Sequence, residues 1–250
     1  EWLSTDDRVT FFKEYGAFEG PKRIRVGEEV IEGKNIYINV GARARELPIP
    51  GMDEVDWLDN ERLLNLEELP EHLVIIGGSY IGLEFGQMFR RFGSEVTVLE
   101  GAPQIMARED EDVAEEAKRI LRQEGITIHE GVNIKNVANQ KNGVSIEMEA
   151  GENIPAEVSG SHLLVAAGRI PNSDTLNLEA AGIEYNQRGF IGVDDYCRTN
   201  VEGVYAVGDV NGQGAFTHTS VNDAEIVLDL FKGGDRNLSV TYLALVDTAA

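Results

Sequence analysis

The sequence predicts an α/β protein with a doubly wound, mostly parallel sheet, and three consecutive segments support this prediction. An apolar run of strand length, Leu73–Ile76, ends in a glycine-rich turn. A segment with helical character, Tyr80–Phe92, follows the turn, and a second short β-rich run ends at Glu100. Because two parallel strands need a crossover connection, usually a helix, this order of strand, helix and strand indicates a parallel sheet.

Short strands separated by glycine turns are predicted before this unit, within residues 1–40. Polar and apolar residues alternate there, which is typical of antiparallel strands with one buried face. The rigid connector Pro48–Gly51 then marks a candidate domain boundary, and a short helix is predicted at 59–66. The predicted strands of the first segment are 9–12, 22–26, 29–32 and 35–40.

Helical and strand patterns continue after the strand–helix–strand unit. Apolar residues at helical spacing predict a helix over 112–124, which Gly125 closes. The sequence pattern changes again at 168–172, and this change marks another candidate domain boundary. The other predicted elements are a strand at 126–129, a β-meander over 131–165, a short helix at 176–181, a β-run at 203–209, a helix at 220–231 and a strand at 239–246.

Composition and charge restrict the possible functions. The 250 residues are 42% hydrophobic and 26% charged, an ordinary balance for a soluble globular protein. The net charge of −22 is expected to repel nucleic acid and anionic membranes. No segment has the pattern of a signal peptide or of a bilayer-spanning helix, so we expect a cytoplasmic protein.

Cysteine and histidine residues give no support for a disulfide or a metal site. Cys197 is the only cysteine, so an internal disulfide is excluded. The four histidines are scattered and lack the spacing of metal ligands. We therefore expect no bound metal.

The glycine-rich turn has the spacing of a Rossmann-like dinucleotide site. Gly77 permits a tight turn, and Gly82 allows the helix to pack closely on the sheet. The N–H groups at the helix start attract a pyrophosphate, and Glu100 is placed to bind a ribose 2′-hydroxyl. Ser79 replaces the middle glycine of the G-x-G-x-x-G pattern, so its hydroxyl either lengthens the approach of the pyrophosphate or bonds to it.

Four sequence blocks together resemble one enzyme family. They are Gly77–Glu84, Ala166–Asn172, Thr199–Asp209 and Gly214–Asp223. In the order and spacing of these blocks the chain resembles the pyridine nucleotide–disulfide oxidoreductases, the family that includes dihydrolipoamide dehydrogenase and mercuric reductase. The fourth block is similar to the mercuric-reductase-like branch in particular.

The resemblance implies an FAD-binding domain that is split in sequence by an inserted NAD(P)-binding domain, each with a β-meander. Residues 1–52 and 173–232 would be the middle and final parts of the FAD domain, 53–172 the NAD(P) domain, and 233–250 the start of a dimerisation domain. The family's FAD fingerprint, C-x4-C redox pair and C-terminal histidine–glutamate pair have no counterpart here. The FAD domain is therefore expected to be incomplete, and this chain alone inactive.

The resemblance also implies contacts with both cofactors, and it assigns no catalytic residue. Tyr80 would lie over the flavin, and Glu84 near the nicotinamide carboxamide. Ile134 would pack on the adenine, Gly168 would approach the nicotinamide ribose, and Asp209 would bind a ribityl hydroxyl. The residues on the NAD side are Gly77, Gly78, Ser79, Tyr80, Ile81, Gly82, Leu83, Glu84, Glu100, Ile134 and Gly168. Those on the flavin side are Gly41, Asp209, Ala215, Phe216, Thr217 and His218.

The function implied for the intact enzyme is transfer of hydride from NADH to FAD and onward to a disulfide or related acceptor, in a homodimer. Glu100 favours NAD over NADP, because its carboxylate would repel a 2′-phosphate. One alternative is an NADH oxidase or ferredoxin-reductase type of flavoprotein without a redox disulfide. Another is a catalytically inactive NAD-binding fragment. The final acceptor stays open, because the groups that bind it have no counterpart in this sequence.

Overall fold

The structure is a computed structural model, and it describes residues 5–238. The chain forms two compact units, which we call the first unit (1–43 and 170–250) and the second unit (44–169). The chain passes between them twice, through the paired strands β5 (Ala42–Ala44) and β13 (Arg169–Pro171). These divisions lie near the boundaries predicted at 52/53 and 172/173, but residues 44–52 belong to the second unit.

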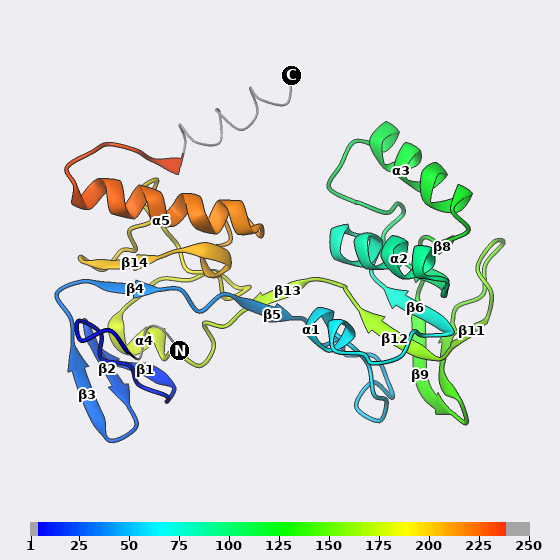
Figure 1. Cartoon of the computed structure of the whole chain (residues 1–250), viewed down its shortest axis with the longest axis horizontal. Coiled ribbons are helices and arrows are strands. Elements are labelled where there is room, and N and C mark those ends of the chain that lie inside the picture. Colours follow the sequence, from blue (N-terminus) through cyan, green and yellow to red (C-terminus); the bar gives the residue numbers. More distant parts are fainter. Residues whose placement is uncertain (1–4, 239–250) are drawn as a thin grey trace. The chain divides into compact units, whose positions relative to one another are not determined.

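A four-stranded parallel sheet forms the centre of the second unit (Figure 1), as the sequence predicts. Its order is β12-β6-β7-β8, so the central strand β6 (His72–Ile76) pairs with β12 (His162–Val165) and β7 (Glu95–Leu99). The outer strand β8 (Thr127–His129) is shorter than predicted. Helix α2 (Tyr80–Phe92) connects β6 to β7, and helix α3 (Glu111–Gln123) connects β7 to β8.

Both faces of this sheet are buried, which explains the continuous apolar run of β6. Leu73 and Ile75 lie in the core formed with α2 and α3, whereas Val74 and Ile76 lie in the core formed with the β-meander. Successive side chains of a strand point to opposite faces, so one run of apolar residues contributes to two cores. The sheet is therefore packed against a hydrophobic core on each of its two faces.

The β-meander comprises β9 (Ile134–Gln140), β10 (Gly143–Met148) and β11 (Glu157–Gly160), in the order β11-β10-β9. The prediction of a meander over 131–165 is wrong for its last strand, because 162–165 joins the parallel sheet as β12. That strand carries buried residues on both faces, as expected for a strand of a parallel sheet that is covered on both sides. Helix α1 (Asn60–Leu64) precedes β6, and the Asp59 carboxylate accepts from the first N–H groups of this helix.

The first unit contains antiparallel strands β1 (Gly16–Gly20), β2 (Arg23–Val26) and β3 (Glu29–Glu32). The strand predicted at 9–12 is absent from the described structure, in which β1 begins at Gly16. Strand β4 (Ile36–Ile38) pairs in parallel with β14 (Val204–Ala206), where an antiparallel strand was predicted. A local alternation pattern cannot reveal a partner strand that is about 170 residues away in sequence.

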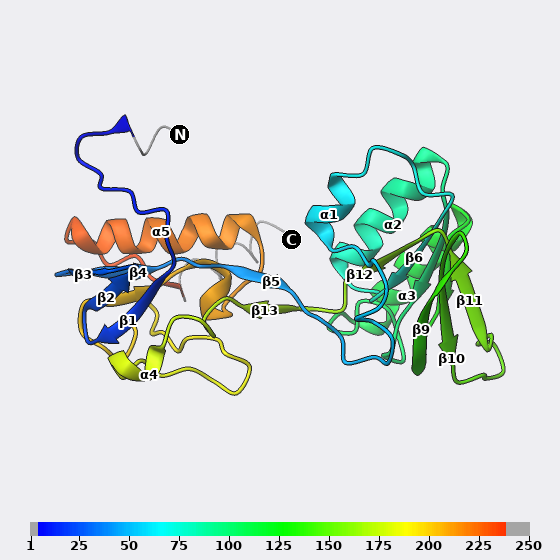
Figure 2. The ribbon, with the colours of Figure 1, turned by 90° about the horizontal axis from the view of Figure 1, so that it is seen from below.

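The first unit also contains helical segments in the described part of the chain, and Figure 2 shows α4 and α5 from below. These segments are α4 (Leu178–Ala181), the 3₁₀ helix η2 (Gly208–Asn211) and α5 (Thr217–Phe231). Helix α5 packs Ile226 and Val227 against a core that includes Cys197 and Tyr205. The strand predicted at 239–246, and most of the predicted dimerisation segment 233–250, lie outside the described residues. No helix within the described part of the chain is long and apolar enough to cross a membrane.

Candidate functional site

The turn after β6 has the tight geometry that the glycine pattern predicts. Gly77 has a φ of +114°, and a Cβ at this residue would lie 2.5 Å from the carbonyl oxygen of Ala166. At Gly82 a Cβ would lie 2.1 Å from the carbonyl oxygen of Gly77. Only glycine meets both demands, so the start of α2 lies directly against the end of β6.

The start of α2 is suited to an anionic group. Ser79 is the N-cap residue, and the first hydrogen bond inside the helix joins the Leu83 N–H to the Ser79 carbonyl at 3.0 Å. The preceding N–H groups therefore point out of the helix end, where the helix dipole also favours negative charge. The Ser79 side chain is exposed and makes no capping hydrogen bond, which leaves its hydroxyl directed to a ligand or to solvent.

Glu100, at the end of β7, lies against the same turn. Its Oε2 accepts a hydrogen bond from the Gly78 N–H at 2.6 Å, and its Oε1 accepts from the Ala102 N–H at 2.7 Å. Each carboxylate oxygen has a second lone pair that can accept from a hydroxyl group. The acid predicted to bind a ribose is thus held in place beside the glycine-rich turn by two backbone donors.

A loop that the sequence analysis did not single out covers this turn. We call residues 101–110 the covering loop. The Met106 N–H donates to the Gly78 carbonyl at 2.8 Å, and the Ile105 side chain is fully buried. A Cβ at Gly78 would lie 2.8 Å from Cγ2 of Ile105, so Gly78 is needed for this packing. The sequence contained one signal for this packing. Ile105 and Met106 form an apolar pair in a loop whose other residues are small or polar.

The remaining predicted residues of α2 have different environments. Tyr80 is 37% exposed, and its hydroxyl donates to the carboxylate of Glu109 in the covering loop. That hydrogen bond raises the pKa of Tyr80. Glu84 is exposed and Ile81 is half-buried. The Leu83 side chain is buried in the core between α2 and the sheet, so a contact of Leu83 with a cofactor could involve only its backbone.

Two further residues predicted on the NAD side lie outside the turn. Ile134 begins β9 and packs, half-buried, against the core between the sheet and the β-meander. Gly168 follows β12, is exposed and has a φ of +112°. Its carbonyl accepts from the Arg45 N–H at 3.0 Å, and a Cβ there would meet no atom within 4 Å. The open space beside Gly168 is compatible with close approach of a ligand.

The residues predicted on the flavin side all belong to the first unit. Gly41 has a φ of +67°, and its carbonyl accepts from the Asn172 N–H at 3.0 Å. Asp209 is half-buried in η2, directly after β14. Residues 215–218 are exposed where α5 begins, and the rings of Phe216 and His218 stack with centroids 5.3 Å apart.

Asp223 on α5 is a buried acid that the sequence analysis did not consider as a site residue. It is 2% exposed, and its Oδ2 accepts from the Gly208 N–H at 2.9 Å and from Asn211 Nδ2 at 2.8 Å. Its Oδ1 is buried without a hydrogen-bond partner among the described residues. Burial raises the pKa of Asp223, while the bonds from Gly208 and Asn211 oppose this. Asp223 thus fixes the turn that carries Asp209.

We expect Asp223 to give the unfolding free energy a distinct pH dependence. The pKa of the folded form lies above that of the unfolded chain, so the folded state binds this proton more tightly. Stability from this group is present at low pH and is lost as pH rises from about 4 through the folded pKa. In Asp223→Asn this loss, up to about 1.4 kcal/mol per pH unit, should disappear. Thermal unfolding at pH 4–8 checks this, and parallel profiles of both proteins would contradict it.

Cys197 is not placed for thiol chemistry. The side chain is fully buried, and burial, followed by the nearby Asp223 and Asp194, raises the pKa of the thiol to about 12. A thiol reacts as its thiolate, so this cysteine is a packing residue. Among the described residues no group of three or more histidine, cysteine, aspartate or glutamate side chains could hold a metal ion.

The chain is similar to known proteins of one family. Residues 1–224 match the family model described as pyridine nucleotide-disulphide oxidoreductase. A dihydrolipoyl dehydrogenase of Cupriavidus necator is 38% identical over 237 residues, which cover 93% of this chain and 50% of that protein. The probable pyridine nucleotide-disulfide oxidoreductase RclA of Escherichia coli is 41% identical over 208 residues, covering 83% of this chain and 46% of RclA.

The similarity extends to solved structures. The solved structure of the HOCl-induced flavoprotein disulfide reductase RclA from Escherichia coli matches with a TM-score of 0.87 and 37% identity, covering 95% of this chain and 54% of that one. A mercuric reductase of Streptomyces lividans is 34% identical over 88% of this chain. The chain belongs to the pyridine nucleotide–disulfide oxidoreductase family, and it spans about half the length of the curated relatives it matches.

Proposed function

We propose that the second unit binds NADH at the glycine-rich turn. The observation that supports this most directly is Glu100, whose carboxylate is held beside the turn by the N–H groups of Gly78 and Ala102. A pyrophosphate at the start of α2 places an adjacent ribose near this carboxylate, because both lie at the carboxyl end of the sheet. Gly77 and Gly82 allow the backbone to approach that closely.

We further propose that the chain forms part of a flavoprotein oxidoreductase that uses FAD. Bound FAD would accept hydride from NADH and pass the electrons to an acceptor. Asp209 is a suitable acceptor for a ribityl hydroxyl, and the exposed start of α5 presents backbone groups and the Phe216 ring. The fixed turn at Gly208, held by Asp223, would orient Asp209 for this role.

The proposed acceptor is a disulfide or a related group, as the names of the relatives suggest. Cys197 takes no direct part, because its thiol is buried and protonated. The alternatives from the sequence, an oxidase or ferredoxin-reductase type of flavoprotein, also leave Cys197 as a packing residue. The cytoplasmic location and the homodimeric state are proposals that rest on the sequence and on family resemblance.

Calorimetric titration of the protein with NADH tests the proposed site directly. We expect saturable binding with a Kd in the range of about 1 μM to 1 mM, the usual range of KM values for enzyme substrates. ADP-ribose should compete, because it contains the pyrophosphate and the ribose that Glu100 is proposed to bind. Absence of NADH binding by a sample with cooperative thermal unfolding would refute the proposal.

A further inference from the structure

A largely buried ion pair, Lys118–Glu130, joins the covering loop to helix α3. Glu130 follows β8, and its side chain is only 15% exposed. Its Oε1 accepts from the Ile105 N–H in the covering loop at 2.8 Å. Its Oε2 accepts from Lys118 Nζ at 2.9 Å. One carboxylate therefore connects the covering loop to helix α3.

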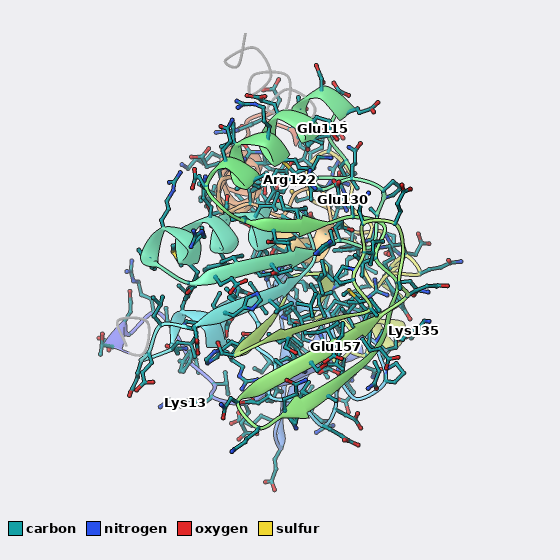
Figure 3. All side chains as sticks on the ribbon, turned by 90° about the vertical axis from the view of Figure 1, so that its right-hand side faces the viewer. Lys13, Glu115, Arg122, Glu130, Lys135 and Glu157 are labelled. Carbon is teal, nitrogen blue, oxygen red and sulfur yellow. The ribbon has the colours of Figure 1, made fainter. Side chains whose placement is uncertain are left out.

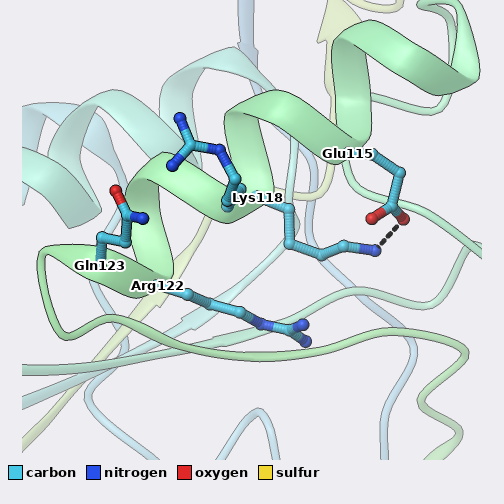
Figure 4. Close-up of a pocket in the computed structure, with 5 residues that line it drawn as sticks. Glu115, Lys118, Arg122 and Gln123 are labelled. Carbon is cyan, nitrogen blue, oxygen red and sulfur yellow. Dashed lines mark hydrogen bonds and ion pairs between the residues drawn. The ribbon is translucent and has the colours of Figure 1, made fainter.

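Lys118 is unusual for a lysine, because its side chain is only 11% exposed. It lies on the face of α3 that also buries Ala114 and Leu121. A buried ammonium group is unfavourable unless it is paired. Figure 4 shows the Lys118 side chain reaching the Glu115 carboxylate, which is its second partner and is 59% exposed. In Figure 3, Glu115 lies on α3 and Glu130 on the segment beside it.

The two partners of Lys118 have different connections. Glu115 lies on α3 itself, three residues before Lys118, and forms an ordinary pair within the helix. Glu130 is the partner that also accepts from the covering loop. The hydrogen bond to Glu115, together with that to Glu130, raises the pKa of Lys118 against the opposing effect of burial. Lys118 is therefore a cation at neutral pH.

We propose that Lys118 and Glu130 are positioning residues for the dinucleotide site, acting through the covering loop on Gly78 and Glu100. This inference rests on the proposed function of the second unit. The hydrogen bonds and ion pairs of the two side chains join them to each other, to Glu115 and to Ile105, and not to the glycine-rich turn.

The connection from Glu130 to the turn is short. Glu130 fixes the Ile105 N–H, and the next residue, Met106, donates to the Gly78 carbonyl. The Ile105 side chain packs where a Cβ of Gly78 would lie. The N–H of Gly78 is in turn the donor to Glu100 Oε2. A covering loop released from Glu130 would therefore disturb both the backbone that faces the pyrophosphate and the carboxylate that faces the ribose.

Four variants separate positioning from simple stabilisation of α3. Glu130→Ala removes the acceptor of the Ile105 N–H, and Lys118→Met removes the ammonium group but keeps the length of the side chain. Glu130→Gln keeps one acceptor oxygen for Ile105, and it serves if Glu130→Ala does not fold. Glu115→Gln is the control, because it removes the charge of the exposed partner of Lys118 and leaves the loop connection intact.

We expect calorimetry with NADH to show a rise in Kd of about tenfold for Glu130→Ala and for Lys118→Met. The rise should be smaller for Glu130→Gln, and Glu115→Gln should match the unaltered protein. Hydrogen exchange of peptides within 101–110, measured without nucleotide, should accelerate in Glu130→Ala and stay unchanged in Glu115→Gln. A loss of helix stability alone would not produce this difference between the two variants.

The outcomes also separate this inference from the proposed function. If the unaltered protein fails to bind NADH, the proposed function is refuted, and faster exchange in Glu130→Ala alone would still support anchoring of the loop. If NADH binds and its Kd is the same in Glu130→Ala, Lys118→Met and the unaltered protein, the positioning role is overturned. Equal changes in Glu130→Ala and Glu115→Gln would overturn it as well.

Discussion

Replacement of Gly82 by valine is expected to raise the Kd for NADH roughly a hundredfold or more, at temperatures where the protein remains folded. A Cβ at this position would lie 2.1 Å from the carbonyl oxygen of Gly77 and 3.3 Å from Cγ2 of Ile75. The obstacle is backbone, which cannot rotate away as a side chain can, so α2 must move from the end of β6. That movement displaces the N–H groups that would face the pyrophosphate.

Gly86 offers a matched control one turn further along α2. A Cβ there would lie 3.2 Å from Cδ1 of Ile75, which is the end of a flexible side chain. Gly86→Ala should therefore be accommodated, and it also gains helix propensity of about 1 kcal/mol. We expect its Kd for NADH to match that of the unaltered protein. Calorimetric titration of both variants checks the prediction, which fails if Gly82→Val binds NADH as tightly as Gly86→Ala does.

Substitution of Glu100 by glutamine is expected to reduce the preference for NADH over NADPH by about tenfold, a change of about 1.4 kcal/mol. The unaltered carboxylate can accept from a 2′-hydroxyl, and its charge would repel a 2′-phosphate. An amide has no net charge and a single acceptor oxygen, so one of the two N–H donors, Gly78 or Ala102, would lose its partner. NADH binding should weaken, while NADPH binding should weaken less or improve.

The variant Glu95→Gln is the control for net charge, because it separates the local effect of Glu100 on nucleotide preference from the loss of one negative charge. Glu95 begins the same strand, β7, at the opposite end from Glu100, and it is exposed. This variant removes one negative charge without touching the glycine-rich turn, so its ratio of NADH to NADPH affinity should equal that of the unaltered protein. Competition calorimetry with both nucleotides measures the ratios. An unaltered protein that binds NADPH as tightly as NADH would refute the role assigned to Glu100.

Much of the second unit could be predicted from local sequence. The apolar run of β6, the glycine-rich turn and the helical segment Tyr80–Phe92 were predicted close to their observed bounds, because each has a local cause: burial on both faces, positive φ at Gly77 and amphipathic spacing. Glu100 could be proposed from its position after the second strand, since the carboxyl ends of adjacent parallel strands lie together. Family membership, too, could be inferred from four short blocks and is shown by the comparisons.

Other features depend on contacts between residues that are distant in sequence, and only the tertiary structure decided them. The parallel pairing of β4 with β14 joins strands about 170 residues apart. The carboxylate of Glu130 receives Ile105 from a loop and Lys118 from a helix. Asp223 is buried because the face of α5 that carries it packs against the turn at Gly208. Local patterns set by φ, ψ and side-chain periodicity were therefore determined by the sequence alone. The partners of buried charges were not, because pairing depends on which chain segments folding brings within a few ångströms of each other.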